Sequence, residues 1–432
     1  MSKKITAIIV GAGHRALLYS TYALEHPQEF QIVGVADPDP IRRRKVAQMH
    51  GFGEDMCFES AEVLAQQPKL ADAIINGTMD TQHIPTSIPL LRRGYDMLLE
   101  KPFAVNEDEM WQLQKVAQET GRKVMICHVL RYAPFYVAIK ERLLAGEIGD
   151  IINIQATEHV SYHHLAVSFV RGKWGNEQEC GAPMLLAKCC HDMDLIMWLM
   201  SGVAPKQLCS FGSDFQFDPA KKPQGAGKRC LVDCQIEPQC LYSAKKHYID
   251  HPDRWAFYVW DCLEHLDNPT IEDKIQSLKT NNIHGRCVWD CNHTVVDHQS
   301  VMINFENGAT ATLNMIGGTA KPERNIHILG TKGEIKGIFD DSVFKIRHID
   351  TTSQLGWQEE VVDLNIGGDK SGMTGSHGGG DLRLVEDFVR VLQGQTPSIS
   401  CTNIADSING HLSVFRAEKS RKNGTVEEMP AL

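Results

Sequence analysis

Residues 184–194, MLLAKCCHDMD, place the ionisable side chains Lys188, His191, Asp192 and Asp194 in an otherwise apolar run. If the run is a helix, Lys188, His191 and Asp194 follow one another at intervals of three residues and share a face. Asp192 points elsewhere, although it lies within i,i+4 of Lys188. Histidine accepts protons near neutral pH, and lysine does so when burial or a nearby cation lowers its pKa. The run therefore predicts a polar face that addresses one pocket; the alternative is an amphipathic helix with an ion pair at its edge.

A second candidate proton acceptor is Lys101, in the tripeptide Glu100-Lys101-Pro102. It follows the apolar segment 96–100, which we expect to be a strand of a parallel sheet, and such sheets bind ligands at the carboxyl ends of their strands. An enzyme that oxidises an alcohol needs a base for the hydroxyl proton while a nicotinamide cofactor takes the hydride. Lys101 is therefore predicted beside the expected nicotinamide; the alternative is a surface lysine that precedes a proline.

The elements that must position these groups begin with a dinucleotide-binding pattern. The apolar run ITAIIV at 5–10 has strand length, and GAGHRA and a helix-like segment follow it. Gly11 permits a tight turn, Gly13 lets the backbone approach a pyrophosphate, and Ala16 stands where a third glycine would allow close helix packing. Strand, glycine turn and helix therefore come in the order that binds a dinucleotide.

A carboxylate in the expected place favours NAD over NADP. The strand FQIVGVAD ends at Asp37, about 20 residues after the glycines, where a carboxylate accepts hydrogen bonds from the ribose hydroxyls. Arg42, Arg43 and Arg44 offer a 2'-phosphate partner instead, but such a cluster is more typical of the solvated start of a helix.

The order of the remaining segments predicts two domains. Strand-like and helix-like segments alternate as far as residue 125, which is typical of an α/β fold with a doubly wound parallel sheet, so we predict a Rossmann domain over 1–125. Over 126–432 we predict an α+β substrate-binding domain with an open, mostly antiparallel sheet, because strand patterns follow one another there and Asn307-Gly308 is a strong hairpin signal. Helices such as 184–200 would cover one sheet face, and the other would be free for homo-oligomer contacts.

Several of these segments together resemble the Gfo/Idh/MocA family of NAD(P)-dependent oxidoreductases. The residues that carry the resemblance are GAGHRA at 11–16, the strand ending at Asp37, Thr78 with His83 five residues on, the tripeptide at 100–102, and HVLRYAPFY at 128–136. The resemblance covers the first 150 residues well, and it implies that Lys101 helps to bind and polarise the reacting hydroxyl. The cofactor contacts that we expect from it are Gly11, Gly13, His14, Arg15, Ala16, Asp37, Thr78, Asp80, His83, Glu100, Lys101 and Arg131.

The apolar run that contains His191 resembles a further motif of this family but departs from it. The family typically has an aspartate four residues before this histidine, where the present chain has Ala187, followed by Lys188. An aspartate would strengthen the imidazole as a base, whereas a nearby ammonium lowers its proton affinity. We predict Lys101, His191 and Lys188 as catalytic residues, with Lys188 binding a substrate hydroxyl, a carboxylate or a sulfonate, or acting as the base itself.

Further substrate contacts are predicted in the segment 158–176, EHVSYHHLAVSFVRGKWGN, which combines hydrogen-bond donors with aromatic rings. Sugars suit such a surface, because their hydroxyls need hydrogen bonds and their C–H faces pack on aromatic side chains. A histidine-bound metal is disfavoured there, because His163 and His164 alternate faces if the segment is a strand. The predicted substrate-binding residues are Lys101, Tyr162, His163, Arg171, Trp174, Lys188, His191, Asp194 and His377.

His377 lies in a glycine-rich stretch, IGGDKSGMTGSHGGGD at 366–381, which precedes a helix-like segment. Its backbone freedom suits a loop that closes over a substrate, and an ordinary surface loop is the competing interpretation. We expect Asp381 to cap the helix that follows.

Three closely spaced thiols predict a possible structural metal site. Cys230, Cys234 and Cys240 are ligands that suit zinc or an iron–sulfur cluster, with Cys287 or Cys291 as a candidate fourth ligand. The pattern contains no Cys-x-x-Cys pair, so the alternative is an irregular insertion over 205–297 with free cysteines.

Composition limits the classes of partner. The chain has 432 residues, a formal net charge of -10 and one short arginine cluster, so a nucleic-acid or anionic-membrane surface is not expected. The amino-terminal apolar run is too short for a signal-peptide core, and the thirteen cysteines fit a reducing compartment, so we expect a cytoplasmic protein with a small-molecule ligand.

These features predict an NAD-dependent oxidoreductase of carbohydrate metabolism that acts on a secondary hydroxyl of a sugar, glycoside or cyclitol. One alternative is a redox-neutral hydrolase that uses NAD to oxidise a sugar transiently, eliminates the aglycone and returns the hydride. A second alternative is a sugar sensor that binds NAD without turnover.

Overall fold

The computed structural model describes residues 3–364 and 377–431. The chain forms two compact units, each built from several segments. The first unit comprises Met1–Glu141, Met193–Gly202 and Ser376–Phe415, and the second comprises Arg142–Asp192, Val203–Gly375 and Arg416–Leu432. The predicted Rossmann segment 1–125 falls entirely inside the first unit.

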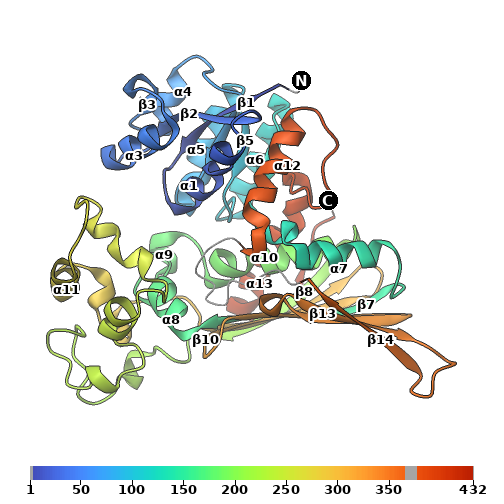
Figure 1. Ribbon diagram of the computed structural model, residues 1–432. Coiled ribbons are helices and arrows are strands. Elements are labelled where there is room, and N and C mark those ends of the chain that lie inside the picture. The colour runs from blue at the N-terminus through green and yellow to red at the C-terminus, as the bar shows by residue number, and fades with distance from the viewer. Residues whose placement is uncertain (1–2, 365–376, 432) are drawn as a thin grey trace. The chain divides into compact units, whose positions relative to one another are not determined.

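The sheet of the first unit has six parallel strands in the order β3-β2-β1-β4-β5-β6 (Figure 1). Their bounds are β1 Ile5–Val10, β2 Phe30–Ala36, β3 Cys57–Phe58, β4 Ala73–Asn76, β5 Asp96–Leu99 and β6 Val124–Ile126. Strand β1 pairs in parallel with β2 on one side and with β4 on the other, so the strand order reverses beside β1. The predicted doubly wound parallel sheet is confirmed, and its carboxyl edge at this reversal is where such sheets bind ligands.

The helices of the first unit include one from the far end of the sequence. They are α1 His14–Ser20, α2 Tyr22–Glu25, α3 Pro40–His50, α4 Ala61–Gln66, α5 His83–Arg92, α6 Glu107–Thr120 and α12 Gly380–Leu392. In α12 the apolar side chains Leu384, Val385 and Phe388 join the core that also contains Tyr19 and Ile9. This packing buries the apolar stripe of α12 and brings the residues that begin this helix into the first unit.

The second unit is built on a nine-stranded sheet in the order β14-β13-β12-β11-β7-β10-β9-β8-β15 (Figure 1). Its strands are β7 Ile151–Ser161, β8 Pro205–Ser213, β9 His298–Phe305, β10 Thr310–Thr319, β11 Glu323–Gly330, β12 Gly333–Ile338, β13 Val343–Ile349, β14 Trp357–Asp363 and β15 Glu427–Glu428. Every neighbouring pair is antiparallel except β7 with β10. The predicted open, mostly antiparallel sheet is confirmed, and Asn307-Gly308 links β9 to β10 with Gly308 at a φ of 87°.

The two faces of this sheet differ. Side chains alternate between buried and exposed along β9 and β10, as a sheet with one solvated face requires. The exposed face carries Phe211, Met302 and Ile316, which are 71%, 56% and 41% exposed. The buried face receives the first half of helix α10, whose side chains contact β7 and β11.

An irregular insertion separates β8 from β9. It contains short helical turns and helix α11 Ile271–Lys279, which begins with a capping box between Thr270 and Asp273. A small core of its own includes Tyr248, Val259 and Leu278. The irregular segment predicted over 205–297 therefore starts later than expected, because residues 205–213 are strand β8 of the sheet.

Three helices pass from one unit into the other, namely α7 Pro134–Leu144, α10 Met184–Leu199 and α13 Ile404–Asn423. The short helices α8 Tyr162–His164 and α9 Glu177–Cys180 belong to the second unit. Among the described residues, no helix combines the length and the apolar character needed to cross a membrane.

Candidate functional site

The turn after β1 separates the roles of its glycines. Gly11 has a φ of +79°, and a Cβ at this position would lie 2.7 Å from the backbone nitrogen of Thr78. A Cβ on Gly13 would meet no atom closer than 3.8 Å, so the space above this residue is open. Ala16 is fully buried and packs so closely on Gly77 that a Cβ there would lie 2.8 Å from that of Ala16. Backbone geometry thus requires glycine at position 11. At position 13, the missing side chain instead leaves an open space, which we call the cradle.

Asp37 turns its carboxylate toward this cradle. Its Oδ2 accepts a hydrogen bond from the backbone N–H of Ala12 at 2.7 Å, and its Oδ1 accepts one from the N–H of Asp39 at 2.8 Å. Each oxygen keeps a further lone pair for a hydroxyl donor. Arg43 donates to the carbonyl oxygens of Asp37 and Pro38, so this arginine is held at the end of β2. The open space at Gly13 and the fixed carboxylate fit the diphosphate and ribose of a dinucleotide.

The loop after β4 is tied to the turn after β5 by His83. The Nε2 of His83 lies 3.0 Å from the carbonyl oxygen of Thr78, and its Nδ1 lies 2.7 Å from that of Pro102. The Thr78 hydroxyl donates to Asn76 Oδ1 at 2.8 Å, and Asp80 is buried at the start of the next turn. His83 therefore positions the segment that carries Lys101.

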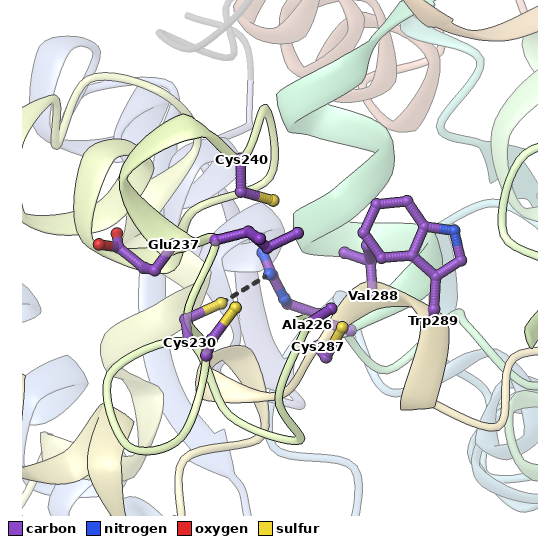
Figure 2. A pocket seen from close by; sticks show the side chains of 10 residues that line it. Ala226, Cys230, Glu237, Cys240, Cys287, Val288 and Trp289 are labelled. Atoms are coloured by element: carbon purple, nitrogen blue, oxygen red, sulfur yellow. Dashed lines mark hydrogen bonds between the residues drawn. The ribbon is translucent and has the colours of Figure 1, made fainter. Parts of the chain in front are cut away.

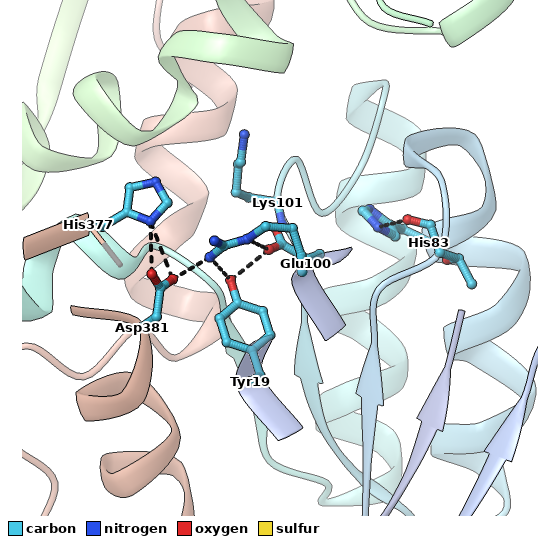
Figure 3. Close-up of polar contacts among 8 residues, drawn as sticks. Tyr19, His83, Glu100, Lys101, His377 and Asp381 are labelled. Atoms are coloured by element: carbon cyan, nitrogen blue, oxygen red, sulfur yellow. Dashed lines mark hydrogen bonds and ion pairs between the residues drawn. The ribbon is translucent and has the colours of Figure 1, made fainter. Parts of the chain in front are cut away.

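Glu100 is the centre of a buried polar network at the carboxyl end of β5 (Figure 3). Its carboxylate accepts hydrogen bonds from Arg15 Nε at 3.0 Å, the Tyr19 hydroxyl at 2.6 Å and the Lys101 backbone N–H at 2.7 Å. Burial alone would raise the pKa of Glu100, but the positive charges of Arg15 and Lys101 and these hydrogen bonds outweigh it, so the pKa lies below its usual value. Glu100 is therefore ionised and fixes the backbone at Lys101.

Lys101 itself is half-buried and follows β5 directly. Figure 3 shows its side chain extending away from the carboxylate of Glu100, with the ammonium group at the end of an extended stem. This is the position that the sequence predicts, at the carboxyl end of a parallel strand and in the same unit as the glycine turn.

Asp381 completes the network from the start of α12. Its carboxylate pairs with the Arg15 guanidinium and lies 3.1 Å from Nδ1 of His377 (Figure 3). Burial alone would raise the pKa of Asp381, but Arg15 and His377 outweigh it and lower this pKa. The expected cap is thus corrected: Asp381 lies inside the first turn of α12, where its carboxylate serves Arg15 and His377. Most of the predicted loop at 366–381 lies outside the described residues.

Helix α10 divides its polar side chains between two sets of partners. The carboxylate of Asp194 accepts hydrogen bonds from Arg131 Nε at 2.7 Å and from Arg131 Nη2 at 2.5 Å, and both side chains are buried. Burial raises the pKa of Asp194, although Arg131 opposes this effect. In the structure, Asp194 thus pairs with Arg131 inside the first unit. The sequence instead predicts that Arg131 contacts the cofactor and that Asp194 contacts the substrate.

The other polar residues of α10 belong to a compact charge cluster of the second unit. Lys188 Nζ lies 2.9 Å from Glu158 Oε1, and Arg324 Nε lies 2.8 Å from Glu158 Oε2 and 2.9 Å from Asp192 Oδ1. Burial raises the pKa of Asp192, although Arg324 opposes this effect. Asp192, four residues after Lys188, thus shares this cluster with it, and Arg324 and Glu158 bridge the two. His191 is only 5% exposed.

The segment after β7 is helical. Tyr162 and His163 lie in α8, and residues 165–170 continue as a wider π-helical turn, so the condition of strand-like alternation does not hold for His163 and His164. Burial lowers the pKa of His163 to about 4, helped by His247 and Arg254, so its imidazole is neutral at pH 7. Trp174 is half-buried, with the ring of Tyr258 5.9 Å away.

Arg171 is placed differently from the other predicted substrate contacts. It is 1% exposed, and its guanidinium donates to the carbonyl oxygens of Arg286 and Tyr242 at 2.7 and 2.6 Å. These bonds join the segment after β7 to the insertion.

The predicted metal site at Cys230, Cys234 and Cys240 is not supported. These thiols line one small pocket with Cys287, but they do not bring three ligand atoms within 4.8 Å of one another. Among the described residues only Glu147, His348 and Glu360 meet that criterion, and Arg142 already bonds to both glutamates of this exposed group. Arg171 lines the same pocket, and its guanidinium donates to Cys230 Sγ at 3.4 Å, so a cation already lies beside one of the expected ligands.

Comparison with known proteins decides the family. Residues 5–128 match the family described as "Oxidoreductase family, NAD-binding Rossmann fold", and residues 140–426 match its "C-terminal alpha/beta domain". The chain belongs to the Gfo/Idh/MocA family of oxidoreductases. The chain is similar to the "Putative oxidoreductase YteT" of Bacillus subtilis (strain 168), with 24% identity over 377 residues, which cover 83% of this chain and 82% of YteT.

Solved structures share the fold at low identity. The WlbA dehydrogenase from Bordetella pertussis in complex with NADH and UDP-GlcNAcA superposes with a TM-score of 0.66 at 15% identity, covering 99% of each chain. A putative myo-inositol dehydrogenase from Sinorhizobium meliloti gives 0.64 at 14% identity, covering 99% of this chain and 100% of the other. These similarities confirm the two-part fold of a Gfo/Idh/MocA oxidoreductase.

Several polar residues around the candidate site of this Gfo/Idh/MocA protein carry no local sequence signal. Tyr19 looks like a core residue of α1, yet its hydroxyl bonds to Glu100, 81 positions later. Glu158 and Arg324 look like alternating strand residues, yet they hold the polar side of α10. The sequence indicates only that a polar residue lies within an apolar pattern. Its partner is too distant along the chain to be predicted from the sequence.

Proposed function

We propose that this protein is an NAD-dependent dehydrogenase of a secondary hydroxyl on a sugar, glycoside or cyclitol. The observation that carries the proposal is the position of Lys101, which follows β5 at the carboxyl edge of the parallel sheet and has its backbone fixed by Glu100 at 2.7 Å. The same unit holds the open cradle at Gly13. A dehydrogenase needs a group for the substrate hydroxyl, which Lys101 offers, and space for a dinucleotide, which the open cradle at Gly13 offers.

The residues that would hold NAD are Gly13, whose open face admits a diphosphate, and Asp37, whose carboxylate suits ribose hydroxyls. Thr78 and His83 line the adjoining loop, and His14 begins α1. Bound NAD supplies a hydride acceptor. The family description supports this choice of cofactor, and the preference for NAD over NADP rests on Asp37.

Lys101 would bind the substrate hydroxyl oxygen through its ammonium group and so favour loss of the hydroxyl proton. Fixing the backbone at Glu100 and Pro102 limits where the ammonium can reach, which supports a role for Lys101 through proximity to the hydroxyl. His191 and Lys188 are proposed substrate-side groups of the second unit, together with Tyr162, His163 and Trp174. A neutral His163 would act there as a hydrogen-bonding group.

The substrate class rests on related proteins and on the aromatic and polar character of residues 162–174. One solved relative was crystallised with a sugar nucleotide, and another is named a putative myo-inositol dehydrogenase. UDP-GlcNAcA and myo-inositol, the compounds that these names print, both contain rings with secondary hydroxyls. A cytoplasmic location and a role in carbohydrate metabolism remain predictions from the sequence.

The decisive experiment is Lys101→Met, tested against a panel of sugars, glycosides and cyclitols by absorbance of NADH. We expect turnover to fall by about 10³-fold or more, while NAD binding measured by calorimetry stays unchanged. Near-normal turnover in the variant would refute the role of Lys101. Release of nitrophenol from a nitrophenyl glycoside without added cofactor and without net NADH would instead support the redox-neutral hydrolase.

We also propose that the exposed sheet face of the second unit forms a contact between copies of this chain. Phe211, Met302 and Ile316 lie on the neighbouring strands β8, β9 and β10, and exposed side chains of this size on one face are typical of association surfaces.

A further inference from the structure

A small pocket in the second unit is lined by four cysteines. Cys230, Cys234, Cys240 and Cys287 share this pocket with Arg171, with Glu237, whose carboxylate accepts a hydrogen bond from Ser243, and with Ala226, Ile236, Val288 and Trp289. Figure 2 shows Cys230, Cys240 and Cys287 with their sulfur atoms turned toward its centre. Neither the cofactor nor the proposed substrate chemistry uses these thiols.

The backbone fixes two of the four cysteines with respect to each other. Arg229 and Arg286 form an isolated antiparallel bridge. The N–H of Cys230 donates to the Gly285 carbonyl at 3.0 Å, and the N–H of Cys287 donates to the Lys228 carbonyl at 2.8 Å. Because Cys230 and Cys287 each follow a bridge residue, their side chains leave the same face of this short ladder.

The guanidinium of Arg171 lies among these thiols. It donates to Cys230 Sγ at 3.4 Å, to the Tyr248 hydroxyl at 3.1 Å and to two carbonyl oxygens. Among the residues that the structure describes, no carboxylate lies within ion-pair distance of this 1% exposed cation. Burying a charge without an opposite charge is costly, so this environment favours a negative partner.

Cys230 is the cysteine whose sulfur accepts a hydrogen bond from Arg171. The other ionisable contact is Tyr248, and burial raises the pKa of its phenol, so Tyr248 stays neutral. Burial also raises the pKa of Cys240, and that of Cys287 to about 11, which keeps these neighbours as thiols. A cysteine sulfur that accepts a hydrogen bond from a buried guanidinium, with further cysteines lining the same pocket, is the arrangement of a redox-active cysteine.

We propose that Cys230 is a peroxide-reactive thiol that forms a disulfide with a second cysteine of this pocket. The Cys230 thiolate attacks one oxygen of a small hydroperoxide such as hydrogen peroxide, the O–O bond breaks, and hydroxide leaves and takes up a proton as water. The sulfur is oxidised to sulfenic acid as the peroxide is reduced. A thiol of Cys234, Cys240 or Cys287 then attacks the sulfenic sulfur and releases a second water, so two thiols and one peroxide give one disulfide and two waters.

This proposal predicts a reactivity order that exposure alone would reverse. Cys262 is the exposed cysteine of the same insertion, whereas Cys230 is 8% exposed. If accessibility governed oxidation, Cys262 would react first. If the contact with Arg171 governs it, Cys230 reacts first with an oxidant small enough to enter the pocket.

The test uses the full-length protein, reduced and then treated with equimolar hydrogen peroxide in the presence of dimedone, with labelled cysteines located by peptide mass spectrometry. We expect about tenfold more label on Cys230 than on Cys262. Without dimedone, we expect a disulfide that links Cys230 to Cys234, Cys240 or Cys287. Label that follows exposure, or pocket thiols that stay reduced, would overturn the proposal.

Two variants separate reactivity from folding. Cys230→Ser should abolish the pocket disulfide, and the matched control Cys262→Ser should leave it intact. Arg171→Met should slow labelling of Cys230; if that variant does not fold, the pair of serine variants still decides the matter. A pocket disulfide that forms at an unchanged rate in Cys230→Ser would assign the reaction to another thiol and contradict the proposal.

Discussion

At the scale of single residues, the carboxylates of Glu100 and Asp381 in the first unit are both held by Arg15. Glu100 accepts bonds from Arg15, Tyr19 and the Lys101 backbone, and Asp381 pairs with the other side of Arg15. Both carboxylates have lowered pKa values, because the attraction of Arg15 outweighs the effect of burial. The sequence predicts that Arg15 contacts the cofactor. In the structure its guanidinium joins Glu100, which follows β5, to Asp381 in α12.

We expect Glu100→Gln to lower the free energy of unfolding by about 3 kcal/mol at pH 7, because it removes a buried charge that neutralises Arg15. The pKa of Glu100 is lower in the folded than in the unfolded state, so its contribution is complete above the ordinary value of 4.5 and is lost as the pH falls through the folded value. The difference from wild type should therefore shrink in acid. Urea denaturation at pH 7 and below pH 4 measures it.

The control for this prediction is Glu25→Gln, which changes an exposed carboxylate of the same unit and should alter stability by less than about 0.5 kcal/mol at either pH. A Glu100→Gln protein as stable as wild type at pH 7 would show that the network does not depend on the charge.

At the scale of elements, the glycine turn illustrates two different reasons for the same residue type. Gly11 is needed for folding, because its φ is positive and a Cβ would lie 2.7 Å from Thr78. Gly13 has a φ of -78° and a ψ of 174°, which any residue adopts, and its surroundings are open. The sequence pattern treats these two glycines alike, and the structure distinguishes them.

We expect Gly11→Ala to destabilise the protein by about 1–3 kcal/mol, whereas Gly13→Ala should change stability by less than about 0.5 kcal/mol. Gly13→Ala should nevertheless weaken NAD binding by about tenfold or more, because its methyl group fills the cradle that the pyrophosphate needs. Denaturation and calorimetric titration with NAD separate the two effects. Unchanged NAD affinity in Gly13→Ala would place the diphosphate elsewhere.

Helix α10 is an element whose polar side chains hold it in place. Arg324 on β11 joins Glu158 to Asp192, and all three side chains are largely buried. We expect Arg324→Met to cost about 3 kcal/mol of stability, because it leaves two buried carboxylates with Lys188 alone. The effect should be smaller in the Asp192→Asn background, with a coupling of about 1 kcal/mol in a double-mutant cycle.

The matched control for this cycle is Lys345→Met, which breaks an exposed ion pair with Glu359 on the same sheet and should cost less than about 1 kcal/mol. Additive effects of Arg324→Met and Asp192→Asn would show that the two residues do not stabilise the helix together.

At the scale of the whole molecule, the nine-stranded sheet of the second unit leaves large apolar side chains exposed. If the proposed self-association is correct, Met302→Glu should shift the protein to a smaller species in size-exclusion chromatography with light scattering, because the charge lies among Phe211 and Ile316. Leu144→Glu is the control, since it changes an equally exposed apolar residue outside the sheet. A wild-type protein that is monomeric at micromolar concentration would refute this association.

The sequence by itself determined the elements whose signals are local. Strand periodicity, the turn at Gly11, the hairpin at Asn307-Gly308 and the placement of Lys101 after a strand all depend on neighbours within a few residues, and the predicted fold class was confirmed. Helix geometry predicted that Lys188, His191 and Asp194 share a face and address one pocket, but Lys188 and Asp194 have separate partners in the structure.

Only the tertiary structure decided which partners those residues have. Asp194 pairs with Arg131, Lys188 with Glu158, and the thiols expected to bind a metal line a pocket with Arg171. Asp381 reaches Arg15 across 366 positions of sequence. A buried charge must find an opposite charge or a strong dipole, but nothing local specifies which one, because the partner is selected by how distant strands and helices pack. The run MLLAKCCHDMD therefore indicates that its charged side chains need partners, but only the tertiary structure identifies them as Arg131, Glu158 and Arg324.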